Sequence, residues 1–199
     1  LVDADSLEDI HSFRQSRDCI TDVVFSRDSL WLATADADMC VALFHFTHRN
    51  EDPTKPEEWV YLGKYRGHYK AITGLLFGEE PETSQPRLFS LGEDRVMQEY
   101  DLENSHITTG LLLKQHVKVE QTAVPTSAFF LQWKILDPKS KRDDVVVTAN
   151  DQYKFKLWGA ATRRCEKTLL GPTYGGPLNR MMIIPGHGFD RYVAYSTHE

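Results

Sequence analysis

The chain has 199 residues, of which 41% are hydrophobic and 26% charged, a composition typical of a soluble globular protein with a sizeable core. Its net charge of -6 argues against a broad basic surface for nucleic acid. The longest apolar run, around Ala128 to Trp133, is far shorter than a membrane span, and no secretory signal is visible. Composition therefore favours neither a nucleic acid nor a membrane as partner.

Cysteine usage favours a reducing, cytoplasmic compartment. Cys19, Cys40 and Cys165 are odd in number, stand far apart and form no C-x-x-C pair. This spacing argues against a zinc ribbon and against a redox motif. We therefore expect three free thiols, each buried or half-buried.

Residues 1–17 are polar and acidic at first, and we interpret them as the tail of a preceding segment. The first residue is Leu, from which we expect that the natural N-terminus lies upstream. Residues 18–66 then alternate short apolar runs with clusters of turn-forming and charged residues, which is typical of strands. The expected strands of this first unit are Ile20–Phe25, Trp31–Thr34, Val41–Phe44 and Trp59–Leu62.

Residues 67–124 repeat this pattern and form the unit around which the chain is organised. Ile72, Leu75 and Phe77 step by three and then two residues, as Ile20, Val23 and Phe25 do. Asp94 precedes Tyr100 by six residues, just as Asp38 precedes Phe44. The expected strands are Ile72–Phe77, Leu88–Ser90, Val96–Tyr100 and Leu111–Leu113, with 114–124 as a connection.

Two further units complete the chain. Residues 125–170 form the third, with expected strands at Phe129–Ile135, Val145–Thr148, Phe155–Trp158 and Cys165–Leu170. Residues 171–199 begin a fourth, with runs at Met181–Ile184 and Tyr192–Ser196. Repeats of this length indicate an array of four-stranded units, each of which buries its faces against its neighbours.

The pair Gly67-His68 near the start of the second unit and Tyr100-Asp101 near its end resemble the signature of the WD-repeat family. Here a tyrosine stands where the family usually has tryptophan. The resemblance implies an all-β fold, a partial β-propeller of about three and a half four-stranded blades. Because so few blades would leave an open ring, we expect the chain to be part of a longer one.

In the WD-repeat family, the matching positions form a hydrogen-bonded network that ties the strands of a blade together. The resemblance assigns this structural role to a set of residues from three blades: His68, Ser90, Asp94, Tyr100, Thr34, Asp38, Thr148 and Trp158. A hydrolase that uses His68 and Ser90 is the alternative from another class. It would also need an oxyanion hole and a substrate cleft, which no sequence feature marks.

The sequence predicts no metal site, no cofactor and no catalytic residue. Asp36-Ala37-Asp38 is similar to the start of a calcium loop, but the later ligands and the glycine are missing. The eight histidines form no metal-binding spacing. The stretch Gly171–Gly176 lacks the lysine of a phosphate loop, so a link between blades is favoured.

Three segments resemble a narrower family: YRGHYKAITGLLFG, PRLFSLGEDRVMQEYDL and KTLLGPTYGGPLNR. They are similar to the cilia- and flagella-associated WD-repeat proteins of the calmodulin- and spoke-associated complex, at the base of radial spokes. The resemblance covers roughly residues 60 to 185. It implies a non-catalytic scaffold of the ciliary or flagellar axoneme, which helps dock radial spokes onto doublet microtubules. The alternative is a general cytoplasmic WD-repeat adaptor of another complex.

Long charged loops at 47–58, 78–87 and 137–144 are the expected interaction surfaces, because function usually lies on loops held by a rigid scaffold. Arginine and aromatic residues dominate binding hot spots. On this basis the candidate partner contacts are Trp59, Tyr69, Arg87, Arg95 and Arg142.

Overall fold

The computed structural model describes residues 1–47, 58–80, 82–133, 143–171, 173–184 and 192–197. Short runs of β-branched, aromatic and aliphatic residues form strands throughout this part of the chain. The strands are β1 (Ile20–Phe25), β2 (Trp31–Asp36), β3 (Cys40–Thr47), β4 (Glu58–Arg66), β5 (Ile72–Glu79), β6 (Pro86–Gly92), β7 (Val96–His106), β8 (Gly110–Lys118), β9 (Pro125–Leu131), β10 (Val145–Asn150), β11 (Lys154–Gly159), β12 (Cys165–Leu170), β13 (Leu178–Ile183) and β14 (Val193–Thr197).

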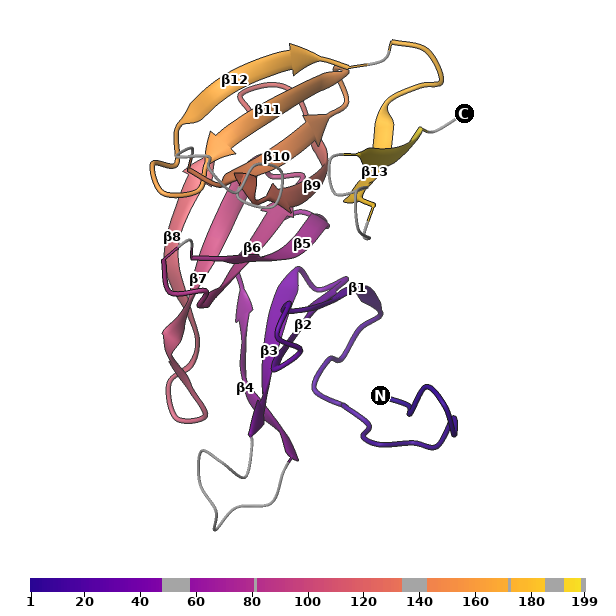
Figure 1. Ribbon diagram of the computed structural model, residues 1–199, viewed down its shortest axis with the longest axis vertical. Helices are drawn as coiled ribbons and strands as arrows, with labels where there is room; N and C mark the ends of the chain where they lie inside the picture. The colour runs from indigo at the N-terminus through magenta and orange to yellow at the C-terminus, as the bar shows by residue number, and fades with distance from the viewer. Residues whose placement is uncertain (48–57, 81, 134–142, 172, 185–191, 198–199) are drawn as a thin grey trace.

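Within the described residues, the strands form three four-stranded sheets and one two-stranded sheet, and strands that follow one another in sequence within a sheet pair antiparallel. We call β1–β4 the first blade, β5–β8 the central blade, β9–β12 the third blade and β13–β14 the partial blade. Figure 1 shows the blades in chain order, with the partial blade beside β9. The all-β propeller architecture is therefore present.

Most strands run past the bounds that the sequence predicted, and β7, β8 and β9 illustrate why. Strand β7 continues past Tyr100 to His106, because Leu102 and Ser105 still point into the protein and are buried. Strand β8 continues to Lys118, through a stretch that alternates polar and less polar residues as an outer strand can. Strand β9 begins at Pro125, four residues before the expected start, since Ser127 to Leu131 pair with β10.

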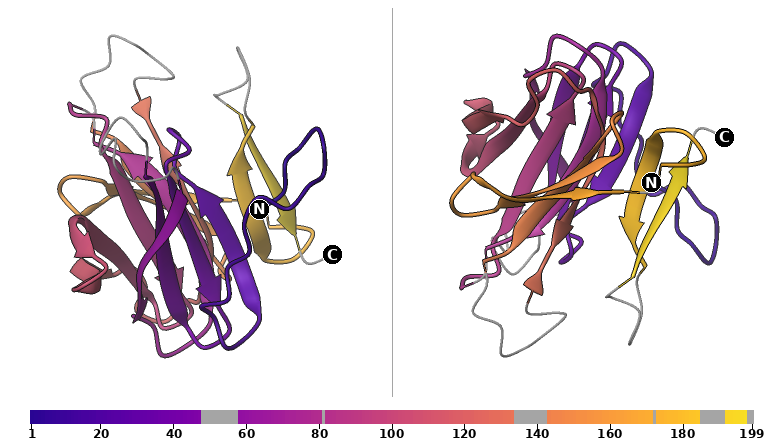
Figure 2. Two further views of the ribbon diagram at one scale, coloured as in Figure 1. Left: turned by 90° about the horizontal axis from the view of Figure 1, so that it is seen from below. Right: turned by 90° about the horizontal axis from the view of Figure 1, so that it is seen from above.

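The core consists of layers between successive blades, which Figure 2 shows stacked face to face. Between the first and central blades, Val41 and Leu43 pack with Leu75, Leu88 and Tyr100. The layer between the central and third blades consists of Leu76, Phe89, Leu91, Met97, Val119, Val146 and Trp158. Because the central sheet is buried on both faces, the blades hold one another in place.

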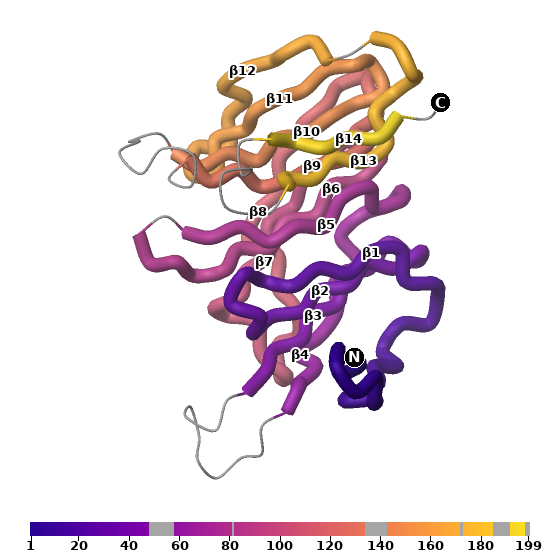
Figure 3. The backbone as a smooth tube through the Cα atoms, turned by 45° about the vertical axis from the view of Figure 1, so that its right-hand side comes forward, coloured from indigo at the N-terminus to yellow at the C-terminus, as the bar shows by residue number. Residues whose placement is uncertain are grey.

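Residues 1–17 form a loop beside the first blade, at the indigo end of the tube in Figure 3. The ring of Phe13 lies 4.3 Å from that of Phe44, measured between centroids. The ring of Tyr65 in β4 lies 6.2 Å from that of Tyr100 in the central blade, again measured between centroids. Phe13 thus covers the ring of Phe44 on the face of the first blade that points away from the central blade, and the interpretation of residues 1–17 as the tail of a preceding segment stays a prediction.

The prediction of three buried or half-buried thiols was wrong for two of them. All three cysteines are free, but Cys19 and Cys165 are exposed and only Cys40 is buried. Cys165 is on β12, an outermost strand whose side chains are all exposed. Burial raises the pKa of the Cys40 thiol, and nearby Asp36 adds to this effect. Among the described residues, no helix has the length and apolar character to cross a membrane.

In an antiparallel sheet, successive connections between strands lie at opposite ends of the sheet. The two ends of each blade therefore carry different connections. The connections β2–β3, β6–β7 and β10–β11 are tight turns, in which Met39, Arg95 and Tyr153 take positive φ angles of 61°, 70° and 59°. We call this the short-turn end. All three loops that the sequence singled out connect strands at the opposite end, which we call the long-loop end.

Candidate functional site

A chain of buried polar side chains lies at the short-turn end of the central blade. His68 Nδ1 is 3.0 Å from both carboxylate oxygens of Asp94, and His68 Nε2 is 2.7 Å from Ser90 Oγ. Ser90 Oγ is in turn 2.9 Å from the hydroxyl of Tyr100. Asp94 also accepts the backbone N–H groups of Tyr69 and Val96, so the network joins the link before β5 to β6 and β7.

Burial shifts the pKa values of two groups in this network toward their neutral forms. Burial lowers the pKa of His68, although the neighbouring Asp94 acts in the opposite direction. Burial raises the pKa of Tyr100 well above its ordinary value, so its hydroxyl stays protonated. Ser90 is 0% exposed and hydrogen-bonded on both sides, which leaves no path for a substrate to its oxygen. The arrangement has the residue types of a catalytic triad, but its burial is typical of a structural hydrogen-bond network.

In the first blade, Asp38 lies in the turn between β2 and β3, as predicted, but its assignment to the network was wrong. Asp38 is exposed, whereas Asp36, two residues earlier, is buried and accepts a hydrogen bond of 2.6 Å from Ser16 Oγ. Asp36 also accepts the backbone N–H of Cys40 at 3.0 Å. Phe44 occupies the place of Tyr100 and has no hydroxyl, and no side-chain hydrogen bond joins Thr34 to a described residue. The first blade therefore has only part of the network.

The third blade uses a third set of residues. Trp158 Nε1 donates to Thr148 Oγ1 at 3.1 Å, which places this predicted pair in contact. Beside it, Glu120 accepts Asn150 Nδ2 at 2.8 Å and Lys156 Nζ at 2.7 Å. Asn150 also accepts the N–H of Lys154, as Asp36 accepts that of Cys40. The residue types differ, yet the strands are tied at the same place.

Gly92 explains why the central blade departs from its neighbours. Gly92 stands at the position of Asp36 in the first blade and Asn150 in the third, each at the end of the second strand. A Cβ atom on Gly92 would lie 2.5 Å from His68 Nδ1 and 2.6 Å from Asp94 Oδ1. The pair of His68 and Asp94 thus fills the space that a single polar side chain fills in the other two blades.

The candidate partner contacts do not form one surface. Tyr69 is 72% exposed at the short-turn end, and its hydroxyl donates to the Asp94 carbonyl at 3.4 Å. Arg95 is half-buried at the same end and donates to the Gln121 carbonyl at 2.9 Å. Trp59 is half-buried at the long-loop end, where its ring lies 5.3 Å from that of Phe46. Arg142 lies outside the described residues.

Arg87 is not a surface residue, which corrects its assignment as a partner contact. It is 6% exposed, and its Nε donates to Glu99 Oε1 at 2.9 Å. Its Nη2 donates to the carbonyl of Ala160 in the third blade at 2.7 Å. Arg163, from the same loop of the third blade, forms an ion pair with the other oxygen of Glu99. Two guanidinium groups on one buried carboxylate thus join the central blade to the third.

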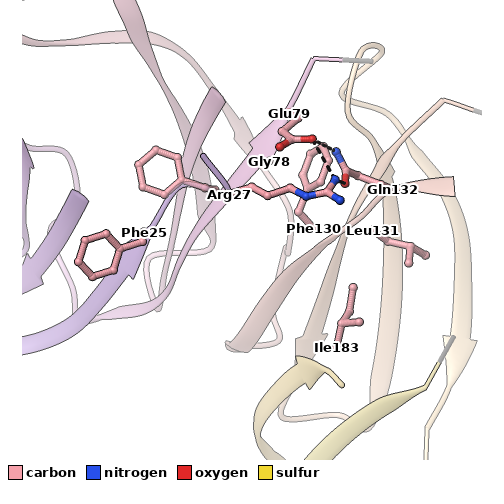
Figure 4. Close-up of a pocket in the computed structure, with 9 residues that line it drawn as sticks. Phe25, Arg27, Gly78, Glu79, Phe130, Leu131, Gln132 and Ile183 are labelled. Carbon is pink, nitrogen blue, oxygen red and sulfur yellow. Dashed lines mark hydrogen bonds and ion pairs between the residues drawn. The ribbon is translucent and has the colours of Figure 1, made fainter. Parts of the chain in front are cut away.

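Clefts lie at the long-loop end. A pocket of about 230 Å³ is lined by Phe25, Phe77, Phe130 and other residues of the innermost strands. Figure 4 shows Arg27 reaching across it from the first blade toward Glu79 and Gln132 of the next two blades. Gln132 Nε2 donates to Glu79 Oε2 at 2.8 Å. Larger clefts of about 640 Å³ and 390 Å³ lie farther from these inner strands.

No cluster of three or more metal-ligating side chains occurs in the described ranges. In the stretch that is similar to a calcium loop, Asp36 already accepts two hydrogen bonds and Asp38 points to solvent. Chemically, the short-turn end of the central blade holds a buried network of hydrogen-bonded groups, whereas the long-loop end offers concave surface with accessible charges.

Several important residues were missed in the sequence. Asp36 and Asn150 share the last position of a second strand, and this alignment could have identified them. Glu120 stands two residues after β8, as His68 stands two residues after β4, so the same alignment marks it. Glu99 and Arg163 are far apart in sequence and belong to different blades. No local pattern predicts such a pair.

No protein-family model matches the chain. The solved structure of U3-55K is similar in fold, with a TM-score of 0.57 and 11% identity, over 84% of this chain and 43% of that one. This likeness supports the WD-repeat propeller fold.

Curated relatives are similar over most of this chain. The protein named cilia- and flagella-associated protein 251 of Tetrahymena thermophila is 34% identical over 98% of this chain and 21% of its own length. Proteins of the same name from Pongo abelii and Mus musculus are 37% and 34% identical over 93% of this chain, and 15% and 14% of theirs. The chain is therefore a WD-repeat-type propeller segment, similar to one stretch of the proteins named cilia- and flagella-associated protein 251, of whose length it spans about a fifth or less.

Proposed function

We propose that this chain is a non-catalytic protein-interaction scaffold of the ciliary or flagellar axoneme, which helps anchor radial spokes to doublet microtubules. The observation that carries the proposal is the similarity to proteins named as cilia- and flagella-associated, over 93% to 98% of this chain and in several organisms. The partners in this proposal are other axonemal proteins, at the radial spoke base and on the doublet.

The geometry supports a scaffold more than an enzyme. The one triad-like arrangement described above, His68 with Ser90 and Asp94, is buried and braces the blade. None of the clefts described above is lined by His68 or Ser90. Blades joined by apolar layers and by the Glu99 ion pairs form a rigid frame, which presents the long-loop end for contacts.

Proximity labelling of the full chain in ciliated and non-ciliated cells tests this proposal. We expect labelling of radial-spoke and tubulin components in the ciliated cells. Labelling of cytosolic complexes alone, in both cell types, would contradict the axonemal assignment and favour the general adaptor. The control is the same labelling enzyme attached to an unrelated propeller.

A Ser90→Ala variant separates the scaffold from the hydrolase. We expect it to lower the free energy of unfolding by roughly 1–3 kcal/mol, because the histidine and tyrosine lose a buried partner. Interaction partners should be unchanged after correction for the amount of folded protein. Loss of a hydrolytic activity in a variant of unchanged stability would contradict the structural role.

A further inference from the structure

The largest of the three clefts described above lies at the long-loop end, where the first and central blades meet. Its volume is about 640 Å³, enough for several side chains of a bound segment. We call it the Trp31 cleft, after the one residue that the first blade contributes. The central blade supplies the remaining lining, which includes Glu80, Arg87, Glu99, Asp101, Glu103 and Lys114.

The charges at the floor of the cleft are already matched. Both ends of the Arg87 guanidinium are used, by Glu99 and the Ala160 carbonyl on one side and by Glu80 at 3.5 Å on the other. Glu99 also pairs with Arg163. Because the guanidinium groups of Arg87 and Arg163 face the carboxylates of Glu80 and Glu99, they form a polar floor whose opposite charges balance, although Nε and Nη1 of Arg163 have no hydrogen-bond partner among the described residues.

The charges at the rim are matched only in part, since Glu80 pairs with Arg87 and Glu103 has no such partner among the described residues. The Glu80 side chain is 45% exposed, and Glu103 is exposed with no cation beside it among the described residues. The carboxylate of Asp101 accepts hydrogen bonds from Asn104 only, again within the described part of the chain. The accessible cation of the lining, Lys114, lies 3.9 Å from Glu99. Carboxylates therefore dominate the surface that an incoming group would meet.

An aromatic wall faces this rim. Trp31 is half-buried, and its ring lies 4.2 Å from the ring of His45, which fixes its orientation. A tryptophan face attracts a lysine or arginine cation, with guanidinium groups the more frequent partners. His45 also lines the cleft of about 390 Å³ at the same blade boundary, where Val60, Leu62 and the 69% exposed Ile107 lie.

We propose that the Trp31 cleft binds an extended segment of a partner protein in which arginine or lysine alternates with apolar residues. The cations would lie between Trp31 and the carboxylates of Glu80 and Glu103, and the apolar side chains would follow the blade boundary toward Ile107. This proposal rests on the proposed scaffold function, whose partner it describes chemically.

Binding of a defined peptide to the purified full chain tests the proposal. The probe is a fluorescein-labelled peptide of about nine residues, the length of an extended strand, in which arginines alternate with leucines. The matched probe has glutamates in place of the arginines. We expect the arginine peptide to bind at least about ten-fold more tightly than the glutamate peptide. Glu103→Lys and Trp31→Ala should each weaken its binding about five-fold, the effect of roughly 1 kcal/mol.

Two charge reversals serve as matched controls. Glu82→Lys changes an exposed carboxylate of the same β5–β6 connection that does not line the cleft, and Asp38→Lys changes one at the short-turn end. Both should bind the arginine peptide within about two-fold of the unchanged protein, since they alter net charge equally but not the cleft. Because Glu103 is exposed, its variant should fold even where Trp31→Ala does not. Equal weakening by all the charge reversals would overturn the proposal.

Retention of the full chain on isolated axonemes separates this inference from the proposed function. If the unchanged protein stays on axonemes but Glu103→Lys does not weaken peptide binding, only the cleft assignment would be wrong. Absence of the unchanged protein from axonemes would contradict the proposed function itself. If Glu103→Lys abolished self-association of the full chain in sedimentation and not peptide binding, the occupant would be a second copy, and the proposal would be wrong.

Discussion

The two ends of the blades differ in how their polar groups are used. At the short-turn end, His68, Ser90, Asp94 and Tyr100 are buried and bonded to one another. At the long-loop end, carboxylates such as that of Glu103 lie exposed at the rim of a cleft. Groups that satisfy one another stabilise a fold, whereas accessible groups remain available to a partner. The same strands can thus carry stability at one end and recognition at the other.

The short-turn end also shows that position matters more than residue type. Asp36 with Ser16, Asp94 with His68, and Asn150 with Glu120 are three solutions at equivalent places in three blades. Each one joins the link before a blade to the turn between its second and third strands. The four predictions that follow test the stabilising role of this end, from the largest expected effect to the smallest.

Replacing Gly92 with alanine should have the largest effect on stability. Its Cβ would lie 2.5 Å from His68 Nδ1 and would displace the pair of His68 and Asp94. We expect the free energy of unfolding to fall by about 3 kcal/mol in chemical denaturation. Gly74→Ala is the matched control, since its nearest neighbour would lie at 3.4 Å, and it should cost less than about 1 kcal/mol. Equal losses for the two variants would contradict the role of Gly92.

Asp94→Ala should lower the free energy of unfolding by about 2–3 kcal/mol, because buried donors lose their acceptor. The groups left without it are His68 Nδ1 and the N–H groups of Tyr69 and Val96. Asp94→Asn keeps an acceptor oxygen and should recover part of this loss. Chemical denaturation measures both variants, and an Asp94→Ala variant as stable as the unchanged protein would remove the network from the account.

The first blade offers a direct comparison of two neighbouring aspartates. Asp36→Ala should cost about 1–2 kcal/mol, because Ser16 and the Cys40 N–H lose their partner. Asp38→Ala should change the free energy of unfolding by less than about 0.5 kcal/mol, since its side chain is exposed. Thermal and chemical denaturation of the two variants would check this order, and the reverse order would restore Asp38 as the network residue.

The pH dependence of stability should show the contribution of His68. Because burial holds the pKa of folded His68 below its unfolded value, the unfolded state binds the proton first as pH falls. The stabilising contribution is complete above the unfolded pKa of about 6.5 and is lost toward the lower, folded pKa, by at most about 1.4 kcal/mol per pH unit. Subtracting the profile of His68→Gln isolates this contribution. A difference that grows as the pH is lowered would have the wrong sign.

The sequence was sufficient for the fold because matched spacings repeat in it, and these determine strands and turns locally. Tyr100 and Thr148 could be placed by counting from the turns, since the count is the same in each blade. Asp38 was assigned to the network by mistake because the count locates a turn but does not say which of two aspartates points inward. Arg87 was taken for a surface residue because its partners are distant in sequence: Glu99 is on another strand, and Ala160 follows β11 in another blade.

The sequence predicted the long-loop end as the interaction surface, but not the residues that line the cleft there. Loop length and charge indicated one end of the blades, but the cleft at Trp31 depends on the meeting of two blades. Residues that line it, such as Trp31 and Glu103, are far apart in sequence and have no shared pattern. Such surfaces follow from packing between repeats and not from any one repeat.

Axonemal retention of two surface variants of the full chain tests the division between the two ends most directly. One variant combines Glu80→Gln, Glu103→Lys and Ile107→Ser at the long-loop end, and the other combines Asp38→Lys and Tyr69→Ser at the short-turn end. The account predicts that the first variant is washed from isolated axonemes under conditions in which the second stays bound, both being folded. Loss of the second variant with retention of the first would contradict it.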